Sequence, residues 1–482
     1  MPSREFATRT ERDSLGTKAI PASVYYGIQT ARAVENFPIS GMRAHPALIR
    51  AAAMVKQAAA EANQELGLLE QPLTSAIAQA ARDVQEGRLN EHFVVDVFQA
   101  GAGVSFHMNV NEVIANRAIE ILGGALGDYS TVHPNDHVNY GQSTNDVFPT
   151  AMRLAALLEL ERLYPVLDSL ATALDAKGKE FWDILKAGRT HMQDAVPIRL
   201  GQEFAAYAGA IRRAATLLRE SAEHLRELGL GGSAVGTGIN THPRYRKLAI
   251  ERLASISGQK LTPADDMRYA MQSNLAMAAV SSALRNLALE VIRISNDLRL
   301  LSSGPNTGLA EINLPALQPG SSIMPGKINP VLPELAAMVG FQVVGNDVAV
   351  AMAVQAGQLD LNVMMPTMAY NVLQSITILT NTLHQLDEHC IRGLTANPQR
   401  NQFYAQSTVS LATALNPYIG DAKAAEIVKE SVASGRSIID IAREKKLLSE
   451  QEIAEILDPV RMTEPQEPLD TASRREDIKA KG

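Results

Sequence analysis

Five long segments of this chain repeat apolar residues at the spacing of an α-helix, and they constrain the fold more than any other feature. A helix of about 30 residues is about 45 Å long, and one that is apolar around most of its girth must be buried. One chain has too little other material to cover five such helices. We therefore expect copies of the chain to associate through helix faces, in preference to a monomeric bundle. The segments are 145–186, where Pro165 is expected to interrupt or kink the helix, 199–228, 274–303, 331–355 and 366–390.

The length of 482 residues predicts more than one domain. Shorter amphipathic helices are expected at 46–65, 72–86 and 109–123, and helices shorten again after residue 397. We therefore predict a mainly α protein with an N-terminal helical domain, a central helix bundle and a small C-terminal helical domain. Ser449 and Glu452 have the spacing of a capping box that opens a last helix. The predicted domains are 1–142, 143–397 and 398–482, the last ending in a polar tail that is expected to be mobile.

Composition excludes several classes of protein. The net charge is −7 without a basic block, which argues against nucleic acid as a partner. Cys390 is the only cysteine, so neither an intramolecular disulfide nor a cysteine-cluster metal site is possible. The N-terminus has no apolar signal core, and no run of 18 apolar residues occurs. We therefore expect a soluble, cytoplasmic protein without a membrane partner.

The segment Gly-Ser-Ser-Ile-Met-Pro-Gly-Lys-Ile-Asn-Pro at 320–330 is the most informative for function. Its prolines and glycines exclude a helix, so it is expected to be a mobile loop. Lys327 and Asn329 suit a substrate carboxylate, and a hydroxyl such as that of Ser321 or Ser322 can be driven toward alkoxide near a cation. The alternative is an ordinary surface turn.

A second polar segment, 137–146, precedes a long helix. Ser143, Thr144 and Asn145 all suit an N-cap, so simple capping is the alternative interpretation. One cap needs only one side chain, however, and a helix N-terminus with several donors is an anion site.

A third polar segment, 188–197, lies between two long helices and contains Thr190 and His191. Thr190 can donate to a carboxylate, and His191 can bind or relay a proton near neutral pH. A solvated or structural histidine is the alternative. In the segment 101–112, two glycines predict close approach of the backbone, and Asn109 and Asn111 supply polar groups.

Two further motifs are weak. The glycine-rich run 229–238 lacks the spacing of a dinucleotide loop and follows a helix instead of a strand. His133 and His137 have metal-like spacing, but the proline after His133 prevents them from sharing a helix face. We therefore expect neither a cofactor nor a metal.

The segment 320–330 matches the signature of the fumarase/aspartase superfamily, which the chain resembles over roughly residues 12–462. Its aspartate ammonia-lyase branch is most similar. The resemblance rests also on Asp13–Thr17, Tyr25–Gly27, Asn135–Asn139, Gln142–Asp146, Gly188–Thr190, Leu200–Phe204 and Gln358–Met364. It implies the three-domain fold of that family, whose central five-helix bundles form a twenty-helix core in a homotetramer, with each active site built from three subunits.

The resemblance also implies a reaction: anti elimination of an amine or water from a succinyl compound to give fumarate, without a cofactor. Ser321 would be the general base once its loop closes. By the same carry-over, Ser143, Thr144 and Ser322 would surround the carboxylate beside the acidic proton, Thr190, Lys327 and Asn329 would hold the other carboxylate, Asn145 and the catalytic His191 would face the leaving amine, and Met324 and Val104 would line the site.

Three positions depart from the family pattern. Val104 stands where aspartases have a threonine that donates to the developing aci-carboxylate, and losing one such donor typically costs about 100- to 1,000-fold in rate. Asn306 stands where an arginine is usual, and Met365 where a glutamate is usual. These changes suit a larger, less polar group on the substrate nitrogen.

Four functions therefore stay open. Aspartate ammonia-lyase is the leading hypothesis, and a lyase for an N-substituted aspartate, such as an aminodicarboxylate, is the alternative. Fumarate hydratase is less favoured, since the His191 loop is similar to that of aspartases. A purely structural member of the superfamily is disfavoured by the intact Ser321, Lys327 and Asn329.

Overall fold

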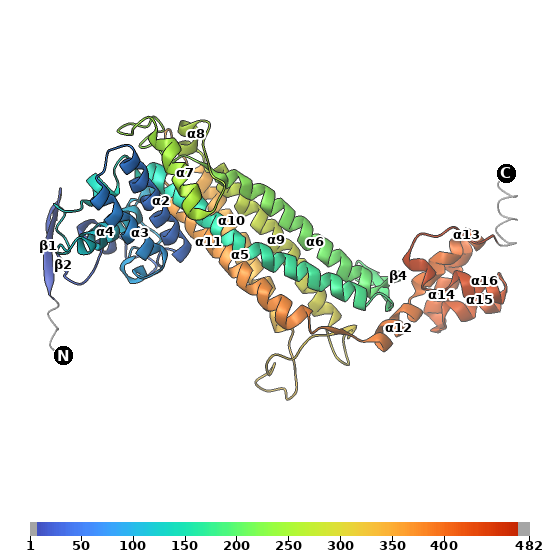
Figure 1. Ribbon diagram of the computed structural model, residues 1–482. Coiled ribbons are helices and arrows are strands. Elements are labelled where there is room, and N and C mark those ends of the chain that lie inside the picture. Colours follow the sequence, from blue (N-terminus) through green and yellow to red (C-terminus); the bar gives the residue numbers. More distant parts are fainter. Residues whose placement is uncertain (1–6, 471–482) are drawn as a thin grey trace. The chain divides into compact units, whose positions relative to one another are not determined.

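Helices dominate the computed structural model, which describes residues 7–470 (Figure 1). Residues 1–6 and the end of the polar tail, for which mobility was expected, lie outside the described part. The predicted N-terminal helices occur close to their expected bounds, as α2 (Pro46–Glu65), α3 (Gln71–Gln85) and α4 (Val104–Ile121). A shorter α1 (Ile28–Asn36) precedes them.

All five predicted long helices are present. The fourth has the predicted bounds, and the first ends earlier than expected because the chain turns into a strand. Pro165 does not interrupt that first helix, which is a correction to the sequence prediction. The bounds are α5 (Thr144–Glu180), α6 (Leu200–Glu223), α9 (Leu275–Leu301), α10 (Val331–Gln355) and α11 (Met365–Leu386).

The chain groups into two compact units, each assembled from separated segments. Every one of the five long helices contributes residues to both units. The predicted division into domains 1–142, 143–397 and 398–482 is not tested by this grouping and stays a prediction. Unit 1 comprises Met1–Val166, Ala214–Leu289 and Met338–Asn381, and unit 2 comprises Leu167–Arg213, Glu290–Ala337 and Thr382–Gly482.

Within unit 1 the long helices are joined by buried polar contacts as well as by aliphatic packing. Ser281 of α9 donates to Asp347 of α10 at 2.6 Å. Asn346 of α10 donates to Gln374 and Ser375 of α11 at 3.0 and 2.9 Å. Such side-chain bonds fix the rotation of one helix against the next, because a rotated helix would leave buried polar groups unsatisfied.

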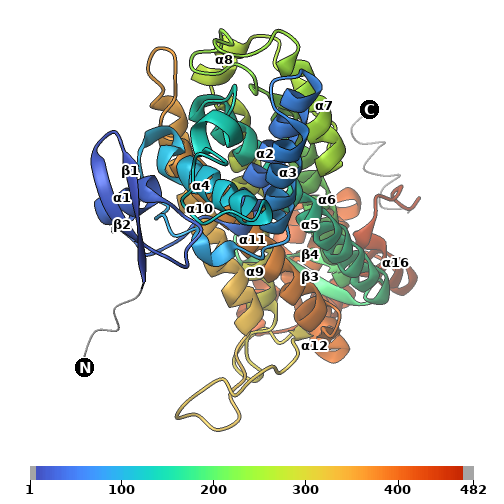
Figure 2. The same cartoon turned by 60° about the vertical axis from the view of Figure 1, so that its left-hand side comes forward.

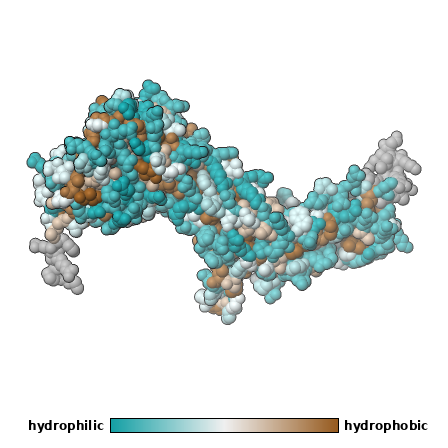
Figure 3. Space-filling model, in the orientation of Figure 1, coloured by the Kyte–Doolittle hydropathy of each residue, from teal (hydrophilic) through white to brown (hydrophobic). Residues whose placement is uncertain are grey.

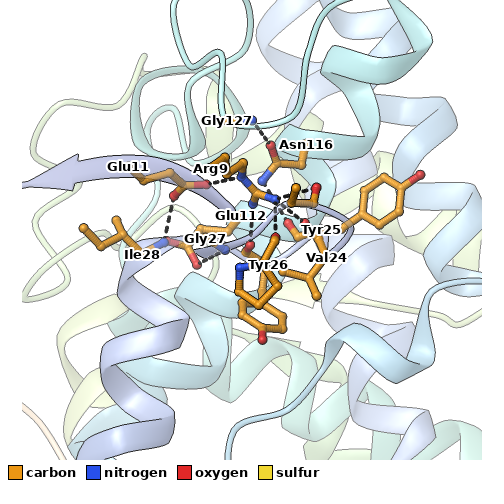
Figure 4. Close-up of polar contacts among 12 residues, drawn as sticks. Arg9, Glu11, Val24, Tyr25, Tyr26, Gly27, Ile28, Glu112, Asn116 and Gly127 are labelled. Atoms are coloured by element: carbon orange, nitrogen blue, oxygen red, sulfur yellow. Dashed lines mark hydrogen bonds and ion pairs between the residues drawn. The ribbon is translucent and has the colours of Figure 1, made fainter. Parts of the chain in front are cut away.

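Buried carboxylates anchor the N-terminal segment of unit 1. The hairpin of β1 (Thr8–Asp13) and β2 (Gly16–Pro21) lies beside α1 (Figure 2). Glu112 of α4 accepts hydrogen bonds from the backbone amides of Gly27, Gln29 and Thr30, as Figure 4 shows in part. The segment Tyr25–Ile28 is therefore held by side chains and not by a sheet.

Unit 2 contains the hairpin of β3 (Leu185–Thr190) and β4 (Gln193–Arg199), in a region where the sequence predicted only a loop. The buried Glu311 accepts from Arg189 at 2.6 Å and pairs with Lys186 at 2.9 Å. Lys186 also contacts Glu203 at 2.8 Å. Because all three partners of this network come from or next to the hairpin, the ion cluster fixes where the turn between the strands lies.

The remaining elements are short. In unit 1 they are β5 (Glu227–Leu228), α7 (Tyr245–Ser257), β6 (Thr262–Pro263) and α8 (Met267–Gln272), and in unit 2 they are β7 (Ile312–Asn313), β8 (Thr395–Ala396), α12 (Pro398–Ser407), α13 (Asn416–Ile419), α14 (Asp421–Ser434), α15 (Ile438–Lys445) and α16 (Glu450–Ile456). Helices α13 to α16 share an aliphatic core. The predicted capping box of Ser449 and Glu452 opens α16.

Helices α9 and α10 are apolar enough that length and composition alone would allow either to cross a membrane. Core helices of soluble proteins have the same composition, and the Ser281–Asp347 bond joins this pair inside the bundle. One face of α10 nevertheless stays uncovered: Met338, Phe341, Val348 and Met352 are about three-fifths exposed. Elsewhere, on the face of the molecule drawn in Figure 3, most side chains are hydrophilic.

Candidate active site

The N-terminus of α5 presents the three adjacent polar residues that the sequence singled out. Ser143 caps the helix, since its Oγ accepts from the Asn145 amide at 3.3 Å. The Oγ1 of Thr144 lies 2.7 Å from Nδ1 of His107. The side-chain Nδ2 of Asn145 donates to the Ala234 carbonyl at 2.8 Å. The capping alternative therefore holds for Ser143, whose own hydroxyl proton stays available to a ligand.

The glycine-rich run 229–238 binds the carboxylate of Asp146 through its backbone amides. This buried carboxylate accepts from the amides of Gly231 and Ser233 at 2.9 and 3.0 Å and from the Ser143 amide at 2.9 Å. Burial raises the pKa of Asp146 to about 6, against the opposing effect of these hydrogen bonds. The run positions the start of α5, and no strand is formed across 230–239.

Val104 is the first residue of α4 and is 42% exposed. The turn before it is built by Ala102 and Gly103, both with positive φ, and a Cβ on Gly103 would collide with Phe148 of α5. The starts of α4 and α5 therefore lie close together in unit 1. Asn109, by contrast, is fully buried and bonds to the backbone of His92 and Val94, so it serves the fold rather than a ligand.

The loop 320–330 has no regular secondary structure and projects from the ends of α9 and α10 (Figure 2). It is closed at its base, where the Gly320 amide donates to the Lys327 carbonyl at 2.8 Å and Asn329 Nδ2 donates to the Gly320 carbonyl at 2.5 Å. At its tip, Ser321 Oγ accepts from the amides of Ile323 and Met324 at 3.2 and 2.8 Å. Amide donors aimed at a hydroxyl oxygen favour its charged, alkoxide form.

Other side chains of this loop are open to solvent. Ser322, Met324 and Lys327 are exposed, and within residues 7–470 the Lys327 ammonium has no hydrogen-bond or ion-pair partner. An unpaired ammonium six residues from an amide-stabilised serine is suited to a carboxylate ligand. The loop therefore combines a candidate base and a candidate anion ligand in unit 2.

Thr190 and His191 lie at the tip of the β3–β4 hairpin, also in unit 2. Thr190 ends β3, opposite Gln193, and the turn consists of His191 and Met192. Both turn residues have φ near +60°, as a two-residue hairpin turn of the mirror-image type requires. Both side chains are exposed. No hairpin was predicted here, because neither turn residue is the glycine or asparagine that usually marks such a turn.

The structure thus forms two groups of the predicted residues, one in each unit. Unit 1 brings together Val104, Ser143, Thr144 and Asn145, and unit 2 carries Thr190, His191 and the loop residues. Of the other two departures from the family pattern, Asn306 is exposed, but Met365 is only 1% exposed at the start of α11. Met365 therefore packs in the core. The expectation that it would add apolar surface to the site is not supported.

Two residues behind Thr144 were missed by the sequence interpretation. Lys56 of α2 and His107 of α4 are buried, and Lys56 Nζ lies 2.6 Å from His107 Nε2. A signal was present, because Lys56 is the one charge in the run Ala51–Ala60.

Comparisons with known proteins identify the family of the chain. Residues 16–345 match the model of the family described as "Lyase", and residues 411–464 match that described as "Fumarase C C-terminus". The chain therefore belongs to the lyase family of the fumarase/aspartase superfamily. It is an enzyme of the carbon–nitrogen lyase class, as the relatives below indicate.

Several curated relatives are named aspartate ammonia-lyase. That of Pseudomonas aeruginosa is 51% identical over 462 residues, covering 95% of this chain and 98% of its own. That of Bacillus subtilis is 48% identical over 457 residues, covering 95% and 96%. Among solved structures, the fumarate lyase:delta crystallin of Brucella melitensis bound to cobalt has a TM-score of 0.92 at 50% identity, covering 95% of this chain and 100% of that one. The class II fumarase of Schistosoma mansoni has a TM-score of 0.93 at 36% identity, covering 96% and 100%.

Proposed function

We propose that this enzyme is an aspartate ammonia-lyase, which converts L-aspartate to fumarate and ammonia. The observation that carries the proposal is the loop 320–330, in which two backbone amides stabilise the Ser321 oxygen close to the unpaired Lys327. The names of the relatives, at 45–51% identity, support the choice of substrate.

In the proposed reaction, Ser321 as alkoxide removes a proton from the carbon next to the β-carboxylate. The electron pair moves into that carboxylate, which becomes an aci-carboxylate dianion. It then returns to form the carbon–carbon double bond as the C–N bond breaks and the amine leaves. The charge that builds up on the carboxylate is stabilised by donors placed before the reaction, here the hydroxyls of Ser143, Thr144 and Ser322.

The remaining proposed contacts hold the substrate. Lys327, Asn329 and Thr190 bind the other carboxylate, while Asn145 and His191 face the amine, and Met324 and Val104 line the site. Closure of the loop 320–330 would exclude water and bring the base to the substrate. No cofactor is proposed, because the leaving group and the electron sink are both on the substrate.

We also propose a cytoplasmic homotetramer whose active sites are shared between subunits, with no nucleic acid or membrane partner. The apolar face of α10, formed by Met338, Phe341, Val348 and Met352, is the surface that supports association. Four side chains about three-fifths exposed on one face of a helix are unusual for a soluble monomer.

A second candidate function is elimination from an N-substituted aspartate. Val104 favours it, because it places an apolar side chain, 42% exposed, where a hydroxyl donor would assist L-aspartate. The buried Met365 does not contribute to this argument.

One assay separates the candidates: absorbance of fumarate with L-aspartate, L-malate or a panel of N-substituted aspartates as substrate. We expect fumarate from L-aspartate. Fumarate from an N-substituted aspartate but none from L-aspartate would replace the first candidate by the second. Fumarate from L-malate alone would indicate a hydratase, and none from any of them would contradict both lyase candidates.

A further inference from the structure

Lys56 is a fully buried lysine with three polar neighbours, two amide oxygens that accept hydrogen bonds from it and one imidazole nitrogen whose role depends on the tautomer. Its Nζ lies 2.6 Å from His107 Nε2, 2.8 Å from Asn139 Oδ1 and 2.9 Å from Gln142 Oε1. The two amides are oriented by their own nitrogens, since Asn139 Nδ2 donates to the Gln142 carbonyl and Gln142 Nε2 donates to the Val138 carbonyl. Their oxygens therefore face Lys56.

With Lys56 as an ammonium, the direction of every bond in this chain is determined. An ammonium has three protons and no acceptor, so it donates one to each neighbour, including His107 Nε2. The proton of the neutral imidazole is then on Nδ1, which donates to Thr144 Oγ1 at 2.7 Å. Since Thr144 Oγ1 accepts this bond, its own proton is free to be donated to a substrate carboxylate.

With Lys56 as a neutral amine, the directions reverse. Its two protons remain with the two amide oxygens, and its lone pair accepts from His107 Nε2–H. Nδ1 then lacks a proton and accepts from the Thr144 hydroxyl. In this state the Thr144 hydroxyl donates its proton to His107 Nδ1. Only lone pairs of Thr144 Oγ1 then face the substrate, and these repel a carboxylate.

We propose that Lys56 and His107 are a proton-linked pair of positioning residues, which turns the Thr144 hydroxyl toward the substrate carboxylate only when Lys56 is an ammonium. The proposal rests on the proposed function, in which Thr144 is a substrate ligand. Binding of a dicarboxylate to enzyme with neutral Lys56 takes up one proton from solvent, which ends on Nζ, while the imidazole proton moves from Nε2 to Nδ1.

The charges around the pair are compatible with such a change. Burial lowers the pKa of Lys56 well below its usual value, and Asp146 opposes this. Burial, followed by the Lys56 charge, lowers the pKa of His107, which keeps the imidazole neutral. The other titratable group that senses Asp146 here is Tyr245 of α7, whose pKa is raised by burial, so it stays a neutral phenol.

The test is proton uptake on binding of succinate, an unreactive dicarboxylate, to the intact enzyme. Calorimetric titrations in two buffers of different ionisation enthalpy, repeated from pH 7 to 9.5, measure the number of protons taken up. We expect uptake to rise with pH toward one proton as free enzyme with neutral Lys56 becomes common. Absence of uptake at every pH would overturn the proposal even without a variant.

Two variants test whether the proton taken up on succinate binding ends on Lys56. In Lys56→Met, we expect the pH-dependent uptake to disappear and succinate affinity to fall about tenfold or more. In His107→Gln, which leaves Lys56 in place but breaks the imidazole link, the pH dependence of KM should be lost while kcat changes less. Lys177→Met, at another largely buried lysine, is the matched control and should behave as wild type.

Uptake that persists unchanged in Lys56→Met would also overturn the proposal. Failure of the proposed function has a different signature: wild-type enzyme would then produce no fumarate from L-aspartate and would not bind succinate at all.

Discussion

Ser321 is the residue on which the proposed elimination depends most directly. Its oxygen accepts hydrogen bonds from two backbone amides, so the structure provides stabilisation for an alkoxide before any substrate arrives. We expect Ser321→Ala to abolish fumarate formation from L-aspartate, with the oligomer unchanged, because the side chain is at an exposed loop. Rates from absorbance and mass from light scattering check this, and substantial residual turnover would refute Ser321 as the base.

Ser322→Ala is the matched control. It removes a hydroxyl from the same loop, but one that accepts no hydrogen bond from these two amides. It is expected to slow the reaction by removing one donor to the carboxylate, and to leave some turnover. Equal loss in both variants would point to a damaged loop instead of a missing base.

Val104 is the residue that best distinguishes the two candidate substrates. Restoring a hydroxyl at this exposed position by Val104→Thr adds one donor near the starts of α4 and α5. We expect kcat/KM for L-aspartate to rise by up to about 100-fold, since loss of such a donor costs about 100- to 1,000-fold. No gain with L-aspartate, together with loss of activity on an N-substituted aspartate, would favour the second candidate.

At the scale of elements, the β3–β4 hairpin depends on a buried ion cluster. Glu311 is fully buried between Arg189 and Lys186, and removing its charge leaves Arg189 without its carboxylate partner and Lys186 with Glu203 alone. We expect Glu311→Gln to cost about 3–5 kcal/mol and to lower the apparent Tm by several degrees, while kcat falls because the Thr190–His191 turn loses its support.

Glu290→Gln is the comparison for this variant. Glu290 pairs with Arg293 on an exposed face of α9, so its loss should change stability by less than about 0.5 kcal/mol. Thermal unfolding of both variants at one protein concentration measures the difference. A Tm equal in the two variants would mean that the cluster does not hold the hairpin.

The elements differ in how well a sequence predicts them, for physical reasons. The bounds of α10 follow from a long apolar run that ends at Gln355, and α16 follows from its capping box. Pro165 was expected to interrupt or kink α5. The interruption does not occur, because packing on both sides outweighs the loss of one backbone hydrogen bond. The β3–β4 hairpin was missed because its turn residues, His191 and Met192, do not usually adopt positive φ.

The candidate site was predictable only where one segment contains it. The loop 320–330 could be identified from its own residues, because base, ammonium and amide are close in sequence. Lys56 and His107 could not be connected to Thr144, since they come from three separate helices. Asn109 was expected to supply a polar group but bonds to buried backbone, a distinction that depends on burial alone.

At the scale of the whole molecule, the uncovered face of α10 determines the expected assembly. Phe341 is 61% exposed at its centre. We expect Phe341→Asp to convert the proposed tetramer into smaller species and to abolish activity, since the sites are proposed to need more than one subunit. Size-exclusion chromatography with light scattering measures this.

Val432→Asp, at an exposed position of α14, serves as the control and should remain fully assembled. A Phe341→Asp variant that is monomeric yet fully active would contradict the proposal of shared sites. A wild-type protein that is monomeric would contradict the assembly itself.

The closed base of the loop 320–330 has a consequence for how this enzyme can evolve. Gly320 bonds to both Lys327 and Asn329, so the two ends of the loop are held together by hydrogen bonds within the loop itself. We therefore expect a substitution elsewhere in the protein to leave the internal geometry of the loop unchanged. The chemistry proposed for Ser321 can then be retained inside the loop while specificity changes at positions outside it, such as Val104.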